Sequence, residues 1–280
     1  RETGRSSGAD HFSSTRFDNA EIVSPCVAGR GIRSLCAVVV ATALWGTSEA
    51  YGDVVRSITS GVEGGRPATR GQSFRATPPA PDYPSGDCDP HTGGLALDPG
   101  AQPNDVQAIG GSVEARTIWA EHWGRTDGPQ VIVVGQIHGN ECAPIAVTRM
   151  ARAFGWRHVG IWLIPTLNPD GYARFSRVNA RAQDLNADGY LVSQPETVAL
   201  LEFTARIRPV LSVHVHSPNG FVGWYGSPTA ARVAGDISAV TGLRYTTAGA
   251  RTGRNWFMWQ AQQQVVASGA VLIEINQLVR

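Results

Sequence analysis

The sequence predicts an α/β protein built on a mixed, mainly parallel sheet with helices on both faces. The first observation is a set of short apolar runs at 131–134, 159–164, 210–215 and 270–273, of which 131–134 has no polar alternation and is typical of a strand buried on both faces. The second is helical spacing in two segments between these runs, at 143–154 and 196–207. Alternating strands and helices favour a parallel sheet with crossover connections.

The elements follow in chain order. Apolar and polar residues alternate over 109–119, which predicts one half-exposed strand, and Asp127-Gly128 predicts a turn into the strand that starts at Val131. The helix over 143–154 should end at Gly155. Residues 166–172 form a turn-rich string after the second apolar strand.

The second helix carries two specific expectations. The string 193–196 reads Ser-Gln-Pro-Glu, which predicts a capping box with Ser193 at the helix start. Val198, Leu201 and Ala205 fall on one face of this helix, which predicts that this face is buried. Pro209 should end the helix before the next strand.

Length and composition indicate one sizeable core with additional segments. The chain has 280 residues, is 42% hydrophobic and carries a formal charge of +1, so its charge gives no argument for nucleic acid or an anionic membrane as a partner. Residues 1–28 are polar and stay unassigned, as disordered or upstream sequence, and 51–105 read as a Pro- and Gly-rich linker or arm. The remaining region, 106–280, should form the folded domain.

Residues 29–50 resemble a secretory signal peptide. Arg30 and Arg33 precede an apolar run at 35–45 and a small-residue pattern at 48–50. The run is too short for a stable membrane span, and a buried helix is the alternative interpretation. We therefore expect a secreted or extracytoplasmic protein, with the bacterial cell envelope as one location. In that compartment, a bridge between Cys88 and Cys142 stays open as an alternative to two unpaired thiols.

Candidate metal ligands lie where the strands end. His138 and Glu141 follow the first apolar strand, and His214 and His216 close the third. Ligands of α/β sheets bind beyond the carboxyl ends of the strands. Imidazole and carboxylate are both good zinc donors, and a catalytic zinc takes three protein ligands and keeps one position open. A lone H-x-x-E pair also arises by chance, so the pair needs support from other motifs.

Six motifs in order provide that support. The segment from Ile109 to Glu274 resembles the zinc metallocarboxypeptidase family, and most of all its bacterial murein peptide amidase branch. The matching strings are Gly-Ser-Val at 111–113, His-Gly-Asn-Glu at 138–141, Asn-Pro-Asp-Gly at 168–171, Arg-Val-Asn-Ala at 177–180 with Asp-Leu-Asn at 184–186, Gln-Pro-Glu-Thr at 194–197, and His216 with Glu274. A series of motifs is far more specific than any one of them.

The resemblance implies roles for individual residues. His138, Glu141 and His216 would bind Zn²⁺, with His216 favoured over His214 by its distance from Pro209. Glu274 would be the general base and Arg177 would stabilise the oxyanion. These assignments imply hydrolysis of a peptide or amide bond in a cell-wall or other small peptide, with murein peptide one candidate substrate.

The same resemblance also implies a binding site for the substrate carboxylate. Asn186 would contact that carboxylate, and Asp184 and Asn168 would be turn and supporting residues. Ala187 stands where the family has the arginine that clamps a C-terminal carboxylate, which puts exopeptidase specificity in question. Arg181, or Arg251 and Arg254, could substitute, and we favour the latter pair.

Further departures leave other functions open. The loop before Pro195 is shorter than in the family, and the chain stops six residues after Glu274, from which we expect a truncated C-terminus. A deacylase or amidase of the aspartoacylase or succinylglutamate desuccinylase type also reads His-Gly-Asn-Glu. A non-catalytic zinc-binding wall module is the third alternative.

Overall fold

The structure is a computed structural model that describes residues 102–152, 156–247, 262 and 269–275. The signal-like segment 29–50, the unassigned residues 1–28, nearly all of the predicted arm, and Arg251 and Arg254 lie outside the described residues. None of the helices in the described part has the length and apolar character that crossing a membrane requires.

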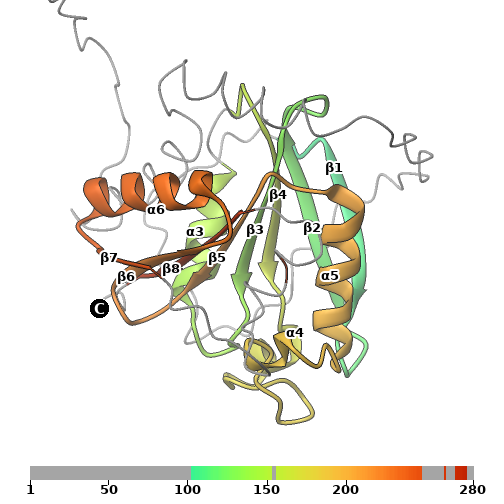
Figure 1. Cartoon of the computed structure of the whole chain (residues 1–280). Helices are drawn as coiled ribbons and strands as arrows, with labels where there is room; N and C mark the ends of the chain where they lie inside the picture. The colour runs from blue at the N-terminus through green and yellow to red at the C-terminus, as the bar shows by residue number, and fades with distance from the viewer. Residues whose placement is uncertain (1–101, 153–155, 248–261, 263–268, 276–280) are drawn as a thin grey trace, which may run out of the picture.

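An eight-stranded sheet organises the described residues (Figure 1). Its spatial order is β1-β2-β4-β3-β5-β8-β6-β7. The strands are β1 Asp105–Gly111, β2 Thr117–Gly124, β3 Gln130–Gln136, β4 Gly160–Thr166, β5 Leu211–His216, β6 Phe221–Tyr225, β7 Arg244–Thr247 and β8 Gly269–Glu274. The central strands β4, β3, β5 and β8 run parallel, and β1, β2 and β6 are joined to this block by antiparallel pairing. The predicted mixed, mainly parallel sheet is confirmed.

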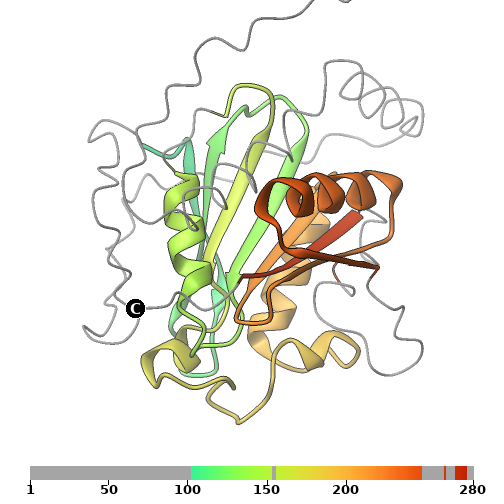
Figure 2. The same cartoon turned by 90° about the vertical axis from the view of Figure 1, so that its left-hand side faces the viewer.

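Helices cover both faces of the sheet, as the buried strands predicted. Helices α3 (Ala143–Ala151) and α6 (Pro228–Thr241) lie in front of the sheet in Figure 2, and α5 (Pro195–Ile207) lies on the opposite face. Val131 and Val133 of β3 belong to the core under α3 and α6, whereas the intervening Ile132 belongs to the core under α5 with Phe203. Alternate residues of one strand thus pack into two separate cores, which explains the absence of polar alternation.

The prediction of one strand over 109–119 is wrong, because the chain reverses in the middle of that segment. β1 and β2 form an antiparallel pair, with Gly111 opposite Thr117. The turn is closed by hydrogen bonds between backbone groups of Ser112, Ala115 and Arg116. Ala115 has a φ of 61°, a conformation usually taken by glycine, so no glycine marks the residue of the turn that has the positive φ.

The start of α5 differs from the predicted capping box. Gln194 is the N-cap residue and Pro195 takes the first helical position, so Ser193 lies outside the helix. The carboxylate of Asp188 accepts hydrogen bonds from the backbone of Ser193 and Gln194 and from the Thr197 hydroxyl. A side chain from the preceding turn therefore holds the residues at the start of α5, and the N-cap residue Gln194 makes no side-chain capping bond.

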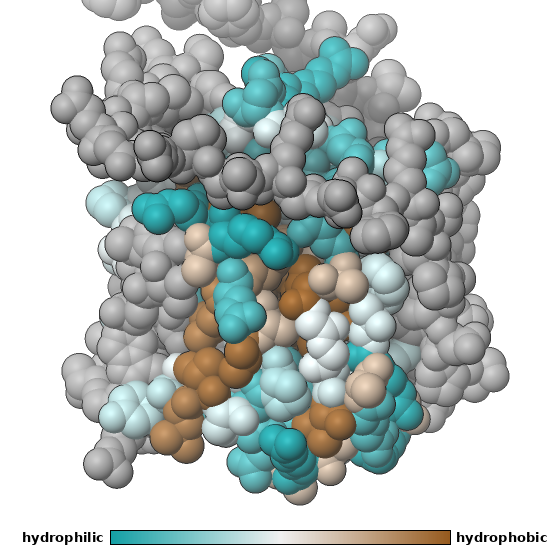
Figure 3. Space-filling view, turned by 90° about the vertical axis from the view of Figure 1, so that its right-hand side faces the viewer, coloured by the Kyte–Doolittle hydropathy of each residue, from teal (hydrophilic) through white to brown (hydrophobic). Residues whose placement is uncertain are grey.

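The predicted buried face of α5 is also wrong. Val198 and Ala205 are exposed, and the buried side chains include Leu200 and Phe203. Leu201 is only partly buried against the same core. Figure 3 looks onto the side of the molecule that carries α5 and β1 and shows apolar and polar patches next to each other. The spacing therefore located the helix but not the face that packs on the sheet.

Residues 217–247, for which the sequence pattern predicted no element, form β6, α6 and β7. The other predicted elements are present with shifted ends. The helix expected over 143–154 covers Ala143–Ala151, and residues 153–155 lie outside the described part. The turn string after β4 contains a short helix, α4 (Pro169–Ala173), and a 3-10 helix, η1, covers Ala187–Gly189.

Candidate metal centre

The loop after β3 carries the first two candidate ligands at the carboxyl end of the sheet. His138 and Glu141 lie in this loop, and the Glu141 backbone N–H donates to the His138 carbonyl at 3.0 Å. Between them, Gly139 packs directly on the backbone of α4, where a Cβ atom would come within 2.0 Å of the Gly171 carbonyl carbon. The glycine thus allows the ligand loop to lie against the Asn-Pro-Asp-Gly helix.

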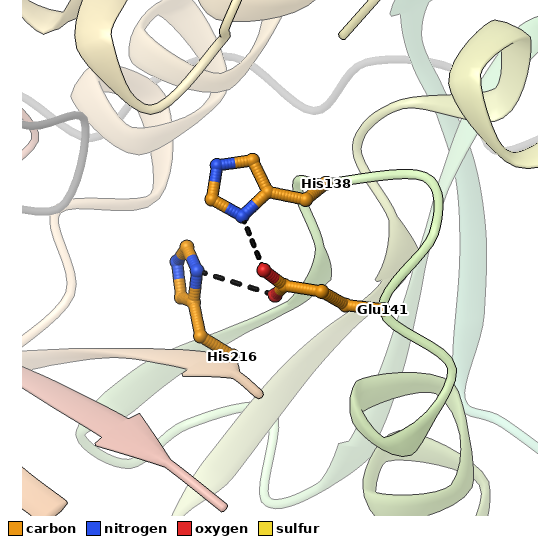
Figure 4. A group of neighbouring side chains, drawn as sticks. All are labelled: His138, Glu141 and His216. Carbon is orange, nitrogen blue, oxygen red and sulfur yellow. Dashed lines mark hydrogen bonds and ion pairs between the residues drawn. The ribbon is translucent and has the colours of Figure 1, made fainter. Parts of the chain in front are cut away.

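Three candidate ligands converge on one another (Figure 4). The Nδ1 atom of His138 is 2.6 Å from Glu141 Oε1, and the Nδ1 atom of His216 is 3.4 Å from Glu141 Oε2. One ligand atom from each of the three residues can be chosen so that all lie within 4.8 Å of one another. All three residues are buried. The sequence separates His216 from Glu141 by 75 positions, and the parallel pairing of β3 with β5 brings them together.

The pKa values of the cluster favour the ligand form of the carboxylate. Burial raises the pKa of Glu141, but hydrogen bonds and charge from His138 and His216 outweigh it and lower the pKa from 4.5 to about 2. For His138, burial lowers the pKa, and the hydrogen bonds to Asp184 and Glu141 reverse this effect, so that its pKa is raised above 6.5. Glu141 is therefore ionised at neutral pH, and His138 binds a proton more readily than a free imidazole does.

Asp184 supports His138 from the side away from Glu141. Its Oδ1 is 3.1 Å from His138 Nε2 and also accepts the backbone N–H of Asn186 at 2.9 Å. Its Oδ2 lies 3.1 Å from both Nε and NH2 of Arg177. Burial raises the pKa of Asp184, but the bond to His138 and the charges of His138 and Arg177 lower it overall. The arrangement leaves His138 Nδ1 facing Glu141, as expected for a metal-binding histidine held by a carboxylate.

Arg177 lies at the edge of the cluster. Its NH1 is 3.6 Å from Glu141 Oε1, and its side chain is half exposed. The guanidinium is therefore anchored to Asp184 on one side and open to solvent on the other. This position lets it face a bound substrate without leaving its ion pair.

Glu274 stands beside His216 at the end of the neighbouring strand. The two residues are direct partners in the parallel pairing of β5 with β8, so their side chains leave the same face of the sheet. Glu274 is nearly buried, and its Oε2 accepts a hydrogen bond from Asn219 Nδ2 at 3.1 Å. A carboxylate oriented by an amide thus lies next to the metal-ligand cluster.

The remaining motif residues hold these segments to one another. Asn168 caps α4, because its Oδ1 accepts from Gly171 N at 2.8 Å, and its Nδ2 donates to the Ile137 carbonyl just before His138. Asp170 is fully buried and accepts from the hydroxyl of Ser112 and the guanidinium of Arg116. These contacts tie the β1–β2 turn to α4 and α4 to the ligand loop.

The residues considered for binding the substrate carboxylate differ in how exposed they are. Asn186 is partly buried near Asp184, and within the described residues its Oδ1 is buried without a hydrogen-bond partner. Ala187 is exposed at the start of η1. Arg181 is exposed, and its backbone N–H donates to Asn179. Arg254 lies outside the described residues, so its predicted role stays a prediction.

His214 is not part of the convergent cluster. It is fully buried on β5, and its Nε2 is 2.6 Å from Oε1 of Gln262. Burial lowers the pKa of His214 to about 3, against the opposing effect of the Gln262 hydrogen bond. His214 is therefore a neutral imidazole beneath the site, and His216, two residues later, is the one that reaches Glu141.

The donor set fits a zinc ion. Two imidazole nitrogens and one ionised carboxylate are the kind of three-ligand set that catalytic zinc sites use. Both Nδ1 atoms face the same carboxylate, and the three side chains lie in a buried position at the sheet edge. Asp184 bonds Nε2 of His138, the ring nitrogen that does not face Glu141, as a carboxylate that supports a metal-binding histidine does.

Sequence reasoning missed three polar residues around the site. Gln136 is fully buried, and its Nε2 donates to the carbonyls of Gly139 and Glu141 inside the ligand loop. Its signal was a polar residue directly after an apolar strand. Asn219 and Gln262 gave no comparable signal, because each contacts the site through a partner far along the chain.

Comparisons with known proteins place the fold. No protein family model matches the chain, and no curated protein matches it in sequence. Among solved structures, the murein-tripeptide amidase MpaA of Escherichia coli O157 is similar, with 17% identity and a TM-score of 0.50. The alignment covers 64% of this chain and 86% of the amidase chain. Thrombin activatable fibrinolysis inhibitor matches 61% of this chain and 62% of its own at 13% identity, also with a TM-score of 0.50.

A metallo-carboxypeptidase from Burkholderia cenocepacia is also similar, with 16% identity, a TM-score of 0.49, and coverage of 64% of this chain and 57% of that one. At these identities the likeness concerns the fold. The chain therefore has a carboxypeptidase-like α/β fold, which confirms at the level of fold the resemblance predicted from the six motifs.

Proposed function

We propose that this protein is a zinc-dependent hydrolase of peptide or amide bonds that works as a carboxypeptidase-like enzyme. One observation carries the proposal: His138, Glu141 and His216 converge in a buried cluster at the carboxyl edge of a carboxypeptidase-like sheet. The three would hold the zinc ion through the two Nδ1 atoms and the Glu141 carboxylate. When bound, zinc supplies a Lewis acid for the substrate carbonyl and lowers the pKa of its water.

The chain supplies the proton transfers and the charge stabilisation. Glu274 accepts the proton of the attacking water and delivers it to the leaving nitrogen. The pairing of Glu274 with His216 supports this role. The hydrogen bond from Asn219 uses one oxygen of the Glu274 carboxylate and leaves the other oxygen free of that contact. Arg177 stabilises the negative charge that develops on the carbonyl oxygen, which its half-exposed position beside Glu141 supports.

The substrate we propose is a small peptide, with murein peptide as the first candidate because one structural neighbour is a murein-tripeptide amidase. Asn186 contributes an amide to its binding, since its buried Oδ1 has no partner among the described residues. Ala187 offers no charge at the neighbouring position. A free C-terminal carboxylate is therefore not the main recognition element in this proposal.

We further propose that the protein acts outside the cytoplasm. The signal-like segment 29–50 is the first support. The second is that Cys142, next to Glu141, is disulfide-bonded, because disulfides persist mainly in oxidising compartments. A reporter enzyme fused after residue 58 should be exported from bacterial cells, and removal of residues 35–45 should abolish that export.

The experiment that tests the catalytic proposal is a substrate panel with purified protein. A murein tripeptide, the same peptide with an amidated C-terminus, and N-acyl amino acids should be compared with and without a chelator. We expect peptide hydrolysis that the chelator abolishes and added zinc restores, with Glu274→Gln as the control for contaminating hydrolases. Cleavage of N-acyl amino acids alone would indicate a deacylase, and zinc binding without any turnover would indicate a non-catalytic module.

A further inference from the structure

A directional chain of buried hydrogen bonds runs from α5 to His214. The Thr204 hydroxyl donates to the Leu200 carbonyl at 2.8 Å, so its oxygen is left to accept. Gln262 Nε2 donates to that oxygen at 2.7 Å, which turns Gln262 Oε1 toward His214. A carbonyl oxygen only accepts, so His214 Nε2 carries the proton and donates at 2.6 Å.

This chain fixes the tautomer of His214. With the proton on Nε2, the Nδ1 atom of the neutral ring is an acceptor. Within the described residues, that Nδ1 is buried and has no hydrogen-bond partner. A buried acceptor without a partner is costly, and buried water is the usual means of satisfying it.

His216 presents the complementary group. Its Nδ1 faces the Glu141 carboxylate, and under the proposed function this nitrogen binds zinc. The proton of the neutral ring must then sit on Nε2, which is also buried and without a partner in the described part of the chain. Metal-binding histidines almost always donate this second N–H to an acceptor.

The fold places this donor and acceptor on the same side of one strand. His214 and His216 are two residues apart on β5, so both side chains leave the same face, roughly 6.6 Å apart along the strand. A water that accepts one hydrogen bond and donates another joins nitrogens roughly 5 to 6 Å apart. Gln136, on the same face of the adjacent β3, has a buried Oε1 without a described partner and is thus an acceptor of the kind that the second water proton requires.

We propose that His214 is a positioning residue for the metal centre, acting through a buried water that accepts the Nε2 proton of His216 and donates to Nδ1 of His214. The inference rests on the proposed zinc site, because zinc at His216 Nδ1 sets the donor. The chain of hydrogen bonds that starts at the Leu200 carbonyl then holds the imidazole ring of His216 in one orientation. Such outer partners typically change metal affinity by about 10- to 100-fold when they are removed.

The first test measures zinc affinity in His214→Leu by competition with a chelator. His122→Leu is the matched control, because His122 is also a buried histidine, hydrogen-bonded to Gln130 and in tilted ring contact with Trp162. It lies on β2, which β4 and β3 separate from β5. We expect both variants to lose stability and only His214→Leu to bind zinc at least tenfold more weakly. Equal zinc affinities in the two variants would overturn the proposal.

A measurement on the wild-type protein decides the matter if His214→Leu does not fold. Nitrogen-15 NMR of the histidine rings in the zinc-loaded protein reports which nitrogen carries each proton. We expect Nε2 protonation of both His214 and His216, with slow solvent exchange of the His216 proton. Zinc binding with a proton on Nδ1 of His214 would overturn this inference alone, whereas failure to bind zinc would overturn the proposed function as well.

Discussion

Replacing Asp184 by asparagine should weaken zinc binding without unfolding the domain. The carboxylate Oδ1 is 3.1 Å from His138 Nε2, and Oδ2 pairs with Arg177. An asparagine can keep one oxygen on His138, but it removes the negative charge and turns an NH₂ group toward the guanidinium. Loss of such an outer partner costs about 10- to 100-fold in metal affinity, or about 1.4 to 2.7 kcal/mol.

The matched control for this prediction is Asp188→Asn. Asp188 is a buried carboxylate four residues later that accepts hydrogen bonds from Ser193 and Thr197 at the start of α5. This control should lower the free energy of unfolding by about 1 to 2 kcal/mol, the value of a lost charge-assisted cap, and should leave zinc affinity within about twofold. Chelator competition and urea unfolding measure the two quantities. If Asp184→Asn binds zinc as tightly as the wild type, Asp184 does not support the ligand.

Three further predictions concern the base, the specificity and the pH response. Glu274→Gln should retain zinc, measured by metal analysis, and lose on the order of 10²-fold or more in kcat, because the amide cannot accept the proton of the water; full activity would exclude Glu274 as the base. Ala187→Arg should raise kcat/KM for peptides with a free C-terminal carboxylate relative to the same peptides amidated, by roughly tenfold or more for a new charge-assisted bond; an unchanged ratio would show that another residue recognises the carboxylate. In the metal-free protein, the pKa of Glu141 is lowered from 4.5 to about 2, so the stability it contributes is fully present above pH 4.5 and is lost as the pH falls toward 2. Urea unfolding should therefore show Glu141→Gln less stable than the wild type at pH 6 and a difference that shrinks below pH 4.5, and a constant difference would contradict the assignment.

The central strands could be predicted from the sequence because a strand that is buried on both faces consists mainly of apolar residues. Val131 to Val134 has no polar residue, and the structure buries this run between two cores. The β1–β2 turn had no comparably clear signal, since the residue with the positive φ is Ala115 and not a glycine. The face of α5 was also mispredicted, because Val198 is apolar and nevertheless exposed.

The site was predictable where a residue lies at or just beyond the carboxyl end of a strand. His138 lies two residues after β3 and His216 is the last residue of β5, and the parallel sheet brings them together. The supporting contacts were harder to predict from the sequence, because they join segments with no shared periodicity. The bond from Asn219 to Glu274 spans 55 positions, and the bond from Gln262 to His214 spans 48. Such contacts depend on the packed structure rather than on a local pattern.

Under the proposed function, His138, Glu141 and His216 form one zinc site that is required for hydrolysis. The most direct test is to titrate metal-free protein with zinc while measuring bound zinc and peptide hydrolysis together. Bound zinc and hydrolysis should both saturate at about one zinc per chain, and His216→Ala should abolish both. Full hydrolytic activity before zinc is added, or stoichiometric zinc binding that survives His216→Ala, would rule out this role of the three residues.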